Sequence, residues 1–380
     1  MRIAYVAAAQ IPSPRANSIQ VMKVCQALTQ NGHQVRLFVP GALPAGWEIL
    51  QQQYGLITGF DVEWISNWRS LHYLDFTSKA LRRARKAQAE LIYTRMPQIA
   101  RAAARAGIPV ILELHDLPGG RFGPGQLESF LNSKAQKKVV FITRALRQLT
   151  EAQLGITLPD TDVIIAPDGV DLERYADLQA PEDARKALGW QERFTALYSG
   201  SFYQGRGMDT LFGLAKSLPE VQFAWVGGKP EEVAVWQEKV NIAGLQNVRL
   251  TGFVSNADLP RYQSAADVLL MPYSPNVAGS SGGDIARVTS PMKLFEYMAC
   301  GRAILTSDLP VLHEVLNDSN AVFCPPDDLA AWKSALYSLQ ADEGKRQSLA
   351  KQALEDVRQY SWRSRMQRIL EGWTTSPVKV

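Results

Sequence analysis

Short apolar runs alternate with segments of helical periodicity along most of the chain. The run at 3–9 is apolar throughout and those at 34–39 and 109–114 are largely apolar, which is typical of strands buried on both faces of a parallel sheet. The helical segments between them, such as 19–31, supply the crossover connections that parallel strands need. This pattern restricts the chain to an α/β fold built on parallel sheets.

The alternation restarts near the middle of the chain, which predicts two domains. A length of 380 residues is also long for one hydrophobic core. A turn-rich stretch at 166–183 separates the two series and is the best linker candidate. We therefore expect two Rossmann-like domains, 1–178 and 179–360, whose strands present their binding loops to a central crevice.

Composition excludes several classes of protein. A hydrophobic fraction of 46% and a charged fraction of 21% indicate an ordinary soluble domain protein, and no apolar run is long enough to span a membrane. The net charge of +4 does not require a nucleic acid partner, and the three cysteines predict a reducing cytoplasm. The first strand is not followed by G-x-G-x-x-G, which counts against a dinucleotide cofactor there.

The stretch 289–307 carries the strongest local signals. Ser290 is suited to an N-cap, Pro291 to the first helical position, and Gly301 to a left-handed residue that ends the helix. Lys293 falls in the first turn, where the helix dipole favours negative charge. A bound anion would resolve this conflict, because the lysine and the free N–H groups would address the same ligand.

The neighbouring residues leave two interpretations open at this point. Glu296 lies one turn beyond Lys293, so the pair could hold the phosphate and the ribose of a nucleoside diphosphate. Alternatively, Lys293 reaches solvent and pairs with Glu296 at i,i+3. Arg206 stands in a glycine-flanked turn ahead of a helix, which is a second anion-binding position or simply an exposed turn. Two cations at two helix starts favour a diphosphate over either one alone.

His115 directly follows the apolar run 109–114 and precedes Asp116. A histidine at the end of a parallel strand could move a proton or orient a substrate hydroxyl, and it could equally be a buried structural residue. The sequence D-T-D at 160–162 is used by some metal-dependent sugar transferases, but here an exposed turn is the better interpretation. With the histidines scattered as well, the sequence predicts no metal site.

A basic amphipathic segment lies at 78–91, with an apolar stripe of Leu81, Ala84 and Leu91. Such a helix can lie on an anionic membrane surface. The solvated face of a packed helix is the interpretation that we favour. Peripheral contact with the inner face of a membrane stays the alternative.

Several motifs together resemble the retaining glycosyltransferases of family 4, which have the GT-B fold. They are S-P-M-K-L-F-E-Y-M-A-C-G-R-A-I-L, P-D-G-V-D, A-L-Y-S-G-S-F, T-G-F-V, and I-Y-T-R-M-P with E-L-H-D-L-P. The resemblance covers nearly the whole chain. It implies that the C-terminal domain holds a nucleotide sugar and the N-terminal domain holds the acceptor. It also implies that the last helix, within 361–380, packs back on the N-terminal domain.

The resemblance assigns roles by position. Glu296 matches a ribose-binding glutamate, Arg206 a diphosphate-binding cation, and His115 a histidine near the transferred sugar, while Phe253 and Val254 fall where the base is held. The expected catalytic residues are His115, Arg206 and Lys293. The expected donor-binding residues are Ser201, Gly205, Phe253, Val254, Ser290, Pro291, Leu294 and Glu296. On the acceptor side we expect Arg15, Asn17, Ser18, Arg95 and Asp116.

Two positions depart from the family pattern. A second family glutamate is Val288 here, and an arginine usual after the first C-domain strand is Ser201. We expect Lys293 to replace that missing positive charge. These departures leave the identity of the transferred sugar open.

The expected activity is retaining transfer from a UDP- or GDP-sugar to a hydroxyl group, without a metal or other cofactor. The acceptor could be a small molecule, a glycan or a lipid-linked molecule. A sugar-nucleotide epimerase on the same fold is the alternative enzyme. An inactive nucleotide-binding protein is the alternative outside the enzymes, because of Val288 and Ser201.

Overall fold

The computed structural model describes residues 1–68, 73–276 and 286–373. The chain forms two compact units. Met1–Asp168 and the chain from Trp362 onward make the first unit, and Gly169–Ser361 make the second. Among the described helices, none combines the length and apolar character needed to cross a membrane.

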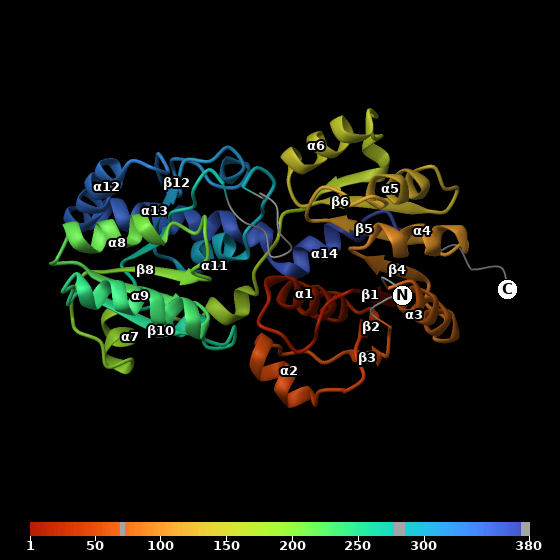
Figure 1. Cartoon of the computed structure of the whole chain (residues 1–380), viewed down its shortest axis with the longest axis horizontal. Helices are drawn as coiled ribbons and strands as arrows, with labels where there is room; N and C mark the ends of the chain where they lie inside the picture. Colours follow the sequence, from red (N-terminus) through yellow and green to blue (C-terminus); the bar gives the residue numbers. More distant parts are fainter. Residues whose placement is uncertain (69–72, 277–285, 374–380) are drawn as a thin grey trace. The chain divides into compact units, whose positions relative to one another are not determined.

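The first unit is built on a parallel sheet with the strand order β3-β2-β1-β4-β5-β6-β7 (Figure 1). Its strands are β1 (Arg2–Val6), β2 (Gln34–Pro40), β3 (Asp61–Ile65), β4 (Leu91–Thr94), β5 (Val110–Leu114), β6 (Lys137–Phe141) and β7 (Val163–Ile165). Its helices are α1 (Ala16–Gln30), α2 (Trp47–Tyr54), α3 (Leu74–Lys86), α4 (Pro97–Arg105), α5 (Gly123–Leu131), α6 (Arg144–Leu154) and α14 (Trp362–Leu370).

The direction of strand addition reverses between β1 and β4. The chain first adds β2 and β3 on one side of β1, and then β4 to β7 on the other. Every residue of β4 and β5 is buried, as expected for strands with both faces covered. The loops after β1 and β4 therefore flank a topological switch point, where open parallel sheets bind ligands.

The helix α14 returns to the first unit and packs against α1 (Figure 1). Trp362, Met366 and Ile369 are buried at helical spacing, so they form the apolar stripe that holds the helix in place. Arg365 is also completely buried, which is unusual for an arginine. The last residues of the expected C-terminal segment, 374–380, lie outside the described residues.

The second unit is built on a parallel sheet with the order β10-β9-β8-β11-β12-β13. Its strands are β8 (Thr195–Gly200), β9 (Gln222–Gly227), β10 (Val248–Gly252), β11 (Val268–Met271), β12 (Ala303–Ser307) and β13 (Val322–Cys324). Its helices are α7 (Pro181–Ala187), α8 (Met208–Ser217), α9 (Pro230–Ile242), α10 (Leu259–Gln263), α11 (Met292–Cys300), α12 (Leu329–Ala341) and α13 (Glu343–Asp356).

Two hydrophobic clusters lie against the second sheet. Leu197 belongs to one cluster, whereas its neighbours Ala196 and Tyr198 belong to the other, as the alternation of side chains along a strand requires. The switch point of this sheet lies between β8 and β11. The loops that follow these two strands carry Arg206 and lead to Lys293.

The boundary between the units lies at Asp168, ahead of the boundary at 178 that the sequence predicts. The physical reason is that the turn-rich stretch packs on the second sheet. Val170 and Tyr175 belong to a hydrophobic cluster of the second unit, and the Tyr175 hydroxyl donates to Gln263 Oε1 at 2.9 Å.

The helix α11 begins one residue later than predicted. Pro291 rather than Ser290 is the N-cap residue, and its extended conformation precedes a helix that starts at Met292. A proline has no side-chain acceptor, so the N-cap residue makes no side-chain cap. Gly301 has φ 65° and ends the helix, as predicted.

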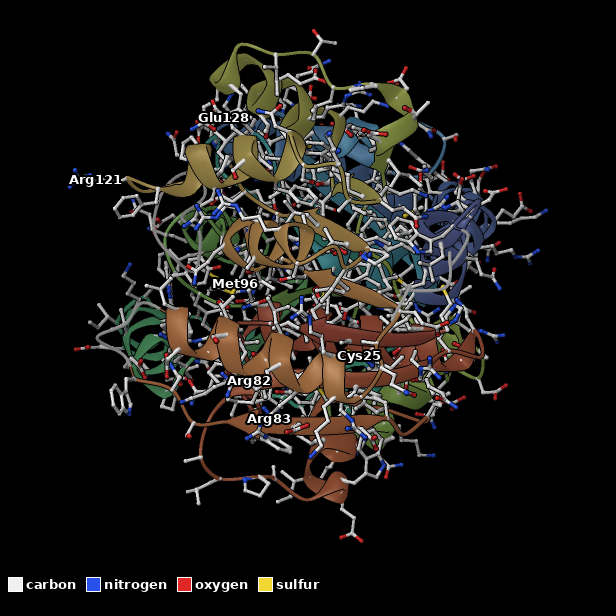
Figure 2. All side chains as sticks on the ribbon, turned by 90° about the vertical axis from the view of Figure 1, so that its right-hand side faces the viewer. Cys25, Arg82, Arg83, Met96, Arg121 and Glu128 are labelled. Carbon is white, nitrogen blue, oxygen red and sulfur yellow. The ribbon has the colours of Figure 1, made fainter. Side chains whose placement is uncertain are left out.

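The basic segment forms α3, which packs through Phe76, Ala80 and Ala84. Arg82 and Arg83 are exposed on the helix surface (Figure 2). This arrangement is the solvated face of a packed helix. Leu91 does not extend the apolar stripe of the helix, because it begins β4 instead.

Candidate active site

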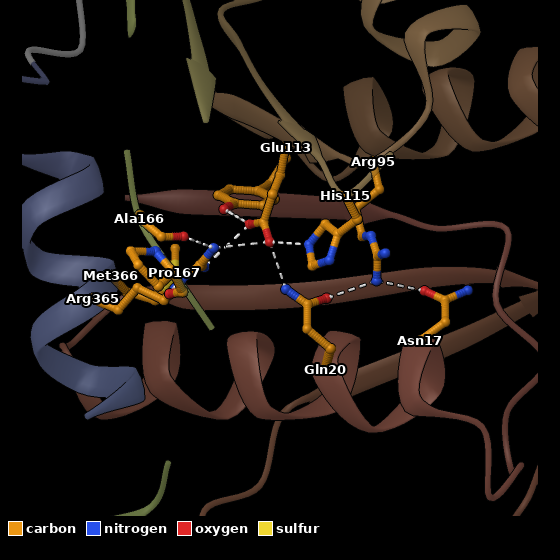
Figure 3. Close-up of polar contacts among 10 residues, drawn as sticks. Asn17, Gln20, Arg95, Glu113, His115, Ala166, Pro167, Arg365 and Met366 are labelled. Carbon is orange, nitrogen blue, oxygen red and sulfur yellow. Dashed lines mark hydrogen bonds and ion pairs between the residues drawn. The ribbon is translucent and has the colours of Figure 1, made fainter. Parts of the chain in front are cut away.

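The first unit holds a buried polar cluster around Glu113, near the carboxyl end of β5. Both carboxylate oxygens are fully enclosed by donors (Figure 3). Oε1 accepts hydrogen bonds from Gln20 Nε2 at 2.7 Å and Arg365 Nη2 at 2.9 Å. Oε2 accepts from Arg365 Nη1 at 3.2 Å and from the Tyr93 hydroxyl.

Arg365 keeps this buried carboxylate ionised. Burial alone would raise the pKa of Glu113, but the Arg365 guanidinium and the hydrogen bond from His115 hold that pKa well below its ordinary value. Arg365 also donates to the carbonyl oxygens of Ala166 at 2.9 Å and Pro167 at 2.7 Å. The guanidinium is thus fixed on several sides.

His115 contacts Glu113 through one ring nitrogen, with Nε2 lying 2.5 Å from Oε1. About 15% of the histidine side chain remains exposed. Burial and the nearby Arg95 lower the pKa of His115 to about 4, although Glu113 opposes the shift. The imidazole is therefore neutral at physiological pH.

Arg95 connects the loop after β4 to the start of α1. Its Nη1 donates to Asn17 Oδ1 at 2.7 Å and to Gln20 Oε1 at 3.1 Å. Since Gln20 in turn donates to Glu113, a continuous hydrogen-bonded chain joins Asn17, Arg95 and His115 (Figure 3). The structure brings these three sequence-predicted residues together.

The other acceptor-side candidates are less closely involved. Arg15 is the exposed N-cap residue of α1 and makes no side-chain cap. The Ser18 hydroxyl donates to the Gln10 carbonyl oxygen at 2.8 Å, so it stabilises the loop. Asp116 is exposed, and its Oδ1 accepts from the backbone N–H of Leu117 at 2.8 Å.

Glu113, His115 and Asp168 offer metal-ligand atoms within 4.8 Å of one another. Glu113 is a poor cation ligand here, because its donors use about all four lone-pair directions of the carboxylate. Arg365 also supplies the positive charge that a metal would bring. The D-T-D sequence forms a short 3-10 helix in which Asp160 pairs with Arg147 at 2.7 Å.

In the second unit, Lys293 presents its ammonium group to an aromatic pocket. Its Nζ is buried and makes no hydrogen bond to any of the described residues. It lies 3.9 Å from the ring centroid of Tyr198 and 5.3 Å from that of Tyr273. Burial lowers the pKa of Lys293 well below its ordinary value, and Arg206 lowers it further. Lys293 does not pair with Glu296 in the way that the alternative interpretation proposed.

Arg206 shares the Tyr273 ring with Lys293. Its Cζ lies 5.0 Å from the Tyr273 centroid and 4.7 Å from that of Tyr203, and its Nη2 donates to the Tyr203 hydroxyl. Its Nε is buried without a hydrogen-bond partner in the described part of the chain. Among those residues, neither Arg206 nor Lys293 forms an ion pair with a carboxylate. Two basic side chains therefore lie close together, and no carboxylate of the described residues pairs with either of them.

Two glycines make this arrangement sterically feasible. A Cβ on Gly200, which has φ 144°, would lie 2.6 Å from Lys293 Nζ. A Cβ on Gly207 would lie 1.7 Å from the carbonyl oxygen of Pro272, so the Arg206 turn could not pack against the loop after β11. Glycine at position 200 lets the Lys293 ammonium group approach the backbone. Glycine at position 207 lets the Arg206 turn approach the backbone of Pro272.

Glu296 lies one turn beyond Lys293 on α11 and is 9% exposed. Its Oε1 is 3.4 Å from the donor Asn256 Nδ2. Asn256 is itself held by Arg174, whose Nη1 donates to Asn256 Oδ1 at 2.8 Å and whose Nη2 donates to the Asn256 carbonyl oxygen. The carboxylate is thus oriented but keeps acceptor capacity for a ligand.

The remaining predicted donor residues lie around these side chains. The Ser201 carbonyl oxygen accepts from the Tyr198 hydroxyl at 2.7 Å, and Ser201 itself is exposed. The Gly205 carbonyl oxygen accepts from the backbone N–H of Ser274 at 3.1 Å. Phe253 is 58% exposed, whereas Val254 is half-buried. Residues in or just before α11 show mixed burial: Val288, Ser290 and Leu294 are buried, and Pro291 is half-buried.

The sequence does not identify several residues that hold these clusters. Glu113 is the one with a local signal, because a glutamate inside the apolar strand V-I-L-E-L requires a buried partner. Arg365, Gln20 and Asn256 have no comparable signal. Their partners lie far away along the chain, 252 residues in the case of Arg365 and Glu113.

Models of two protein families match the chain. The model described as Glycosyltransferase Family 4 matches residues 18–174, and the model described as Glycosyl transferases group 1 matches residues 193–342. A phosphatidyl-myo-inositol mannosyltransferase of Mycolicibacterium smegmatis is 24% identical over 100% of this chain and 96% of its own length. A D-inositol 3-phosphate glycosyltransferase of Xylanimonas cellulosilytica is 27% identical over 69% of this chain and 65% of its own length.

Solved structures share the fold along nearly the whole chain. HepE of Anabaena in complex with UDP has a TM-score of 0.72 at 19% identity. The comparison covers 98% of this chain and 99% of HepE. A sucrose-phosphate synthase of Thermosynechococcus elongatus has a TM-score of 0.74 at 18% identity, with 98% of both chains covered. The two parallel sheets are those of the GT-B fold. The chain therefore belongs to the family 4 glycosyltransferases.

Proposed function

We propose that this glycosyltransferase moves a sugar from a nucleotide-diphosphate sugar to a hydroxyl group of the acceptor, with retention of the anomeric configuration. The proposal rests mainly on one observation, the pair formed by Lys293 and Arg206. Lys293 Nζ and Arg206 Nε are buried beside one tyrosine ring without a carboxylate partner among the described residues, so this place favours an anion that would restore the ammonium form of Lys293.

A diphosphate suits this charge for three reasons. It is a dianion, so it can pair with the ammonium and the guanidinium together. Lys293 lies in the first turn of α11, where the helix dipole favours an anion, and the N-cap residue Pro291 makes no side-chain cap. During transfer the diphosphate becomes the leaving group, and fixed donors stabilise it as its charge develops.

The nucleoside is assigned to residues next to the cations. We infer that Glu296, oriented by Asn256, accepts hydrogen bonds from the ribose hydroxyls. The exposed ring of Phe253 offers a stacking surface for the base, with Val254 beside it. UDP-sugar is the donor we favour, since the structural neighbour HepE was solved with UDP and with UDP-glucose. GDP-sugar is the alternative.

The acceptor is assigned to the first unit. His115, Asn17 and Arg95 offer a neutral imidazole and a cation at the switch point of the first sheet. The names of the relatives refer to inositol-containing molecules, which supports a polyhydroxylated or lipid-linked acceptor. The basic face of α3 would suit contact with an anionic membrane that carries such a lipid.

The proposed transfer uses neither a metal nor another cofactor. The cations Lys293 and Arg206 would do what a divalent ion does in metal-dependent transferases. The departing phosphate would take the proton of the acceptor hydroxyl on the face that it leaves, so that no pair of catalytic carboxylates is needed. Activity that persists in excess chelator is the expected outcome.

A thermal-shift panel of UDP, GDP, ADP and their sugars tests the donor. We expect one nucleoside diphosphate to raise the melting temperature of the wild type, and the change Lys293→Met to remove most of that shift. Lys216→Met is the matched control, because Lys216 is an exposed lysine in the last turn of α8. If no nucleoside diphosphate stabilises the wild type, the proposal is wrong.

Product analysis separates the alternative functions. The anomeric configuration of the product, measured by NMR, tests retention. Conversion of the donor to a second nucleotide sugar without any acceptor would indicate an epimerase. Tight nucleotide binding with neither transfer nor slow hydrolysis of any donor would indicate an inactive binding protein.

A further inference from the structure

The C-terminal helix α14 and His115 are joined through a single side chain, Glu113 (Figure 3). We propose that Glu113 is a positioning residue that fixes the proton of His115 on Nε2 and leaves Nδ1 free to accept a hydrogen bond, and that Arg365 of α14 holds Glu113 in this role. The inference rests on the proposed function, because His115 is assigned there to the acceptor side.

The position of the proton follows from the chemistry of the partner. An ionised carboxylate can only accept hydrogen bonds. Since Nε2 lies 2.5 Å from Glu113 Oε1, this nitrogen must carry the hydrogen. In a neutral imidazole the other nitrogen, Nδ1, then has a lone pair. Nδ1 makes no hydrogen bond to the described residues.

The groups around His115 keep the ring neutral. Burial and the cations Arg95 and Arg365 lower the pKa of His115, and Glu113 raises it. Asp168 also lies within 4.8 Å, and burial raises the pKa of its carboxyl to about 7, which limits its negative charge. The exposed part of the ring therefore offers a lone pair. It would accept a hydrogen bond from a substrate hydroxyl and could not donate one.

Arg365 is needed because a buried carboxylate without a cation would take up a proton. A protonated Glu113 could donate to Nε2 and would reverse the tautomer of His115. Arg365 prevents this with two hydrogen bonds to the carboxylate, and it is itself fixed by the carbonyl oxygens of Ala166 and Pro167. The helix α14 thus acts on the histidine from the far end of the sequence.

Imidazole NMR of protein labelled with ¹⁵N-histidine tests the tautomer without any substrate. The chain has four histidines, and the variant His115→Asn assigns the signal. We expect one protonated Nε2 and one unprotonated Nδ1 for His115, unchanged between about pH 5.5 and 8. A His115 that is protonated on Nδ1, or on both nitrogens, overturns the proposal. Broadening of its signal by added Mn²⁺ overturns it too, because the cluster would then be a metal site.

A matched pair of double variants tests the role of Glu113. Glu113→Gln with Arg365→Met removes both charges but keeps an acceptor oxygen, so the tautomer should be retained. Glu113→Met with Arg365→Met removes the acceptor, so we expect a mixture of tautomers. With a donor that supports transfer, kcat of Glu113→Met with Arg365→Met should fall about tenfold or more, while its KM for the donor stays within about twofold.

A control variant separates positioning from loss of stability. Arg185 is a buried arginine of the second unit that pairs with Asp267 at 2.9 Å, and Arg185→Met should lower the melting temperature without changing the His115 signals. If both double variants keep the wild-type tautomer, Glu113 does not position His115. If no donor supports transfer, the proposed function fails, and the NMR result still decides this inference.

Discussion

Two clusters of charged residues in this chain differ in how completely they are satisfied. In the first unit, Glu113 and Arg365 are fully buried, oppositely charged and hydrogen-bonded to each other and to their surroundings. In the second unit, Lys293 and Arg206 are both basic, and the buried Nζ and Nε atoms lack hydrogen-bond partners among the described residues. Both clusters lie next to the switch point of a parallel sheet.

The difference separates support from binding. A satisfied buried network fixes side chains in one arrangement, whereas unpaired buried charge destabilises the free protein until a ligand supplies the missing partner. We therefore infer that the cluster around Glu113 is part of the scaffold, and that the cluster around Lys293 was built for an anion. Removing a charged side chain should lower the stability of the protein in the first cluster, and should leave it unchanged or raise it in the second.

The largest expected effect comes from Arg365→Met. The change leaves the Glu113 carboxylate buried without its cation, and breaking a buried pair in this way costs about 3–5 kcal/mol of stability. Chemical denaturation should show this loss. The variant that replaces both charges, Glu113→Gln with Arg365→Met, should recover much of it, because no buried charge remains unpaired. Equal stability of the two variants would contradict the satisfied-network interpretation.

The parts of the fold that depend on local pattern could be predicted from the sequence. The runs predicted as strands at 34–39 and 109–114 correspond to β2 (Gln34–Pro40) and β5 (Val110–Leu114), and the helical segment 19–31 overlaps α1 (Ala16–Gln30). Apolar runs and helical periodicity determine these elements directly. The N-cap of α11 was predicted one residue early, at Ser290 instead of Pro291, because both residues fit a helix start and only the backbone conformation distinguishes them.

The contacts that complete the sites could not be predicted in the same way. Lys293 could be singled out, because a cation in a first helical turn contradicts the local electrostatics. Arg365 gives no such signal, since arginine is ordinary on an amphipathic helix and only the tertiary fold brings it to Glu113. Long-range pairing therefore limits what can be read from one sequence.

The second prediction concerns Lys293→Met, which removes an unpaired buried ammonium group. We expect the free variant to be as stable as the wild type, or more stable by about 1 kcal/mol, because the cost of burying the charge disappears. Its affinity for the nucleoside diphosphate should fall about 10- to 100-fold, the value of a hydrogen bond to a charged group. Calorimetry measures both changes. A large loss of stability would mean that Lys293 supports the fold instead.

The third prediction is a pH dependence that arises from the lowered pKa of Lys293. Between the lowered pKa and the unfolded value of about 10.4, the unfolded chain binds more protons, so this group makes the free protein more stable as pH rises. A bound diphosphate favours the ammonium form. Donor binding should therefore take up a proton. The affinity for the donor should fall as pH rises through that window, by at most about tenfold per pH unit.

Calorimetric titrations in buffers with different ionisation enthalpies measure the uptake of a proton on donor binding. The wild type should show this uptake within the window, and Lys293→Met should show none. Glu113→Gln with Arg365→Met is a suitable comparison, because it removes two buried charges of the first cluster and leaves Lys293 unchanged. Uptake that persists in Lys293→Met would assign the titrating group elsewhere.

The smallest expected effect comes from Asn256→Ala, which tests whether the second cluster also contains scaffold. Asn256 orients Glu296 through a long hydrogen bond of 3.4 Å, so its loss should weaken binding of the nucleoside diphosphate by about 1 kcal/mol, or about fivefold. Inorganic pyrophosphate has no ribose, and its affinity should not change. An equal loss of affinity for both ligands would show that Asn256 supports Lys293 and Arg206 rather than Glu296. The ribose contact would then need another assignment.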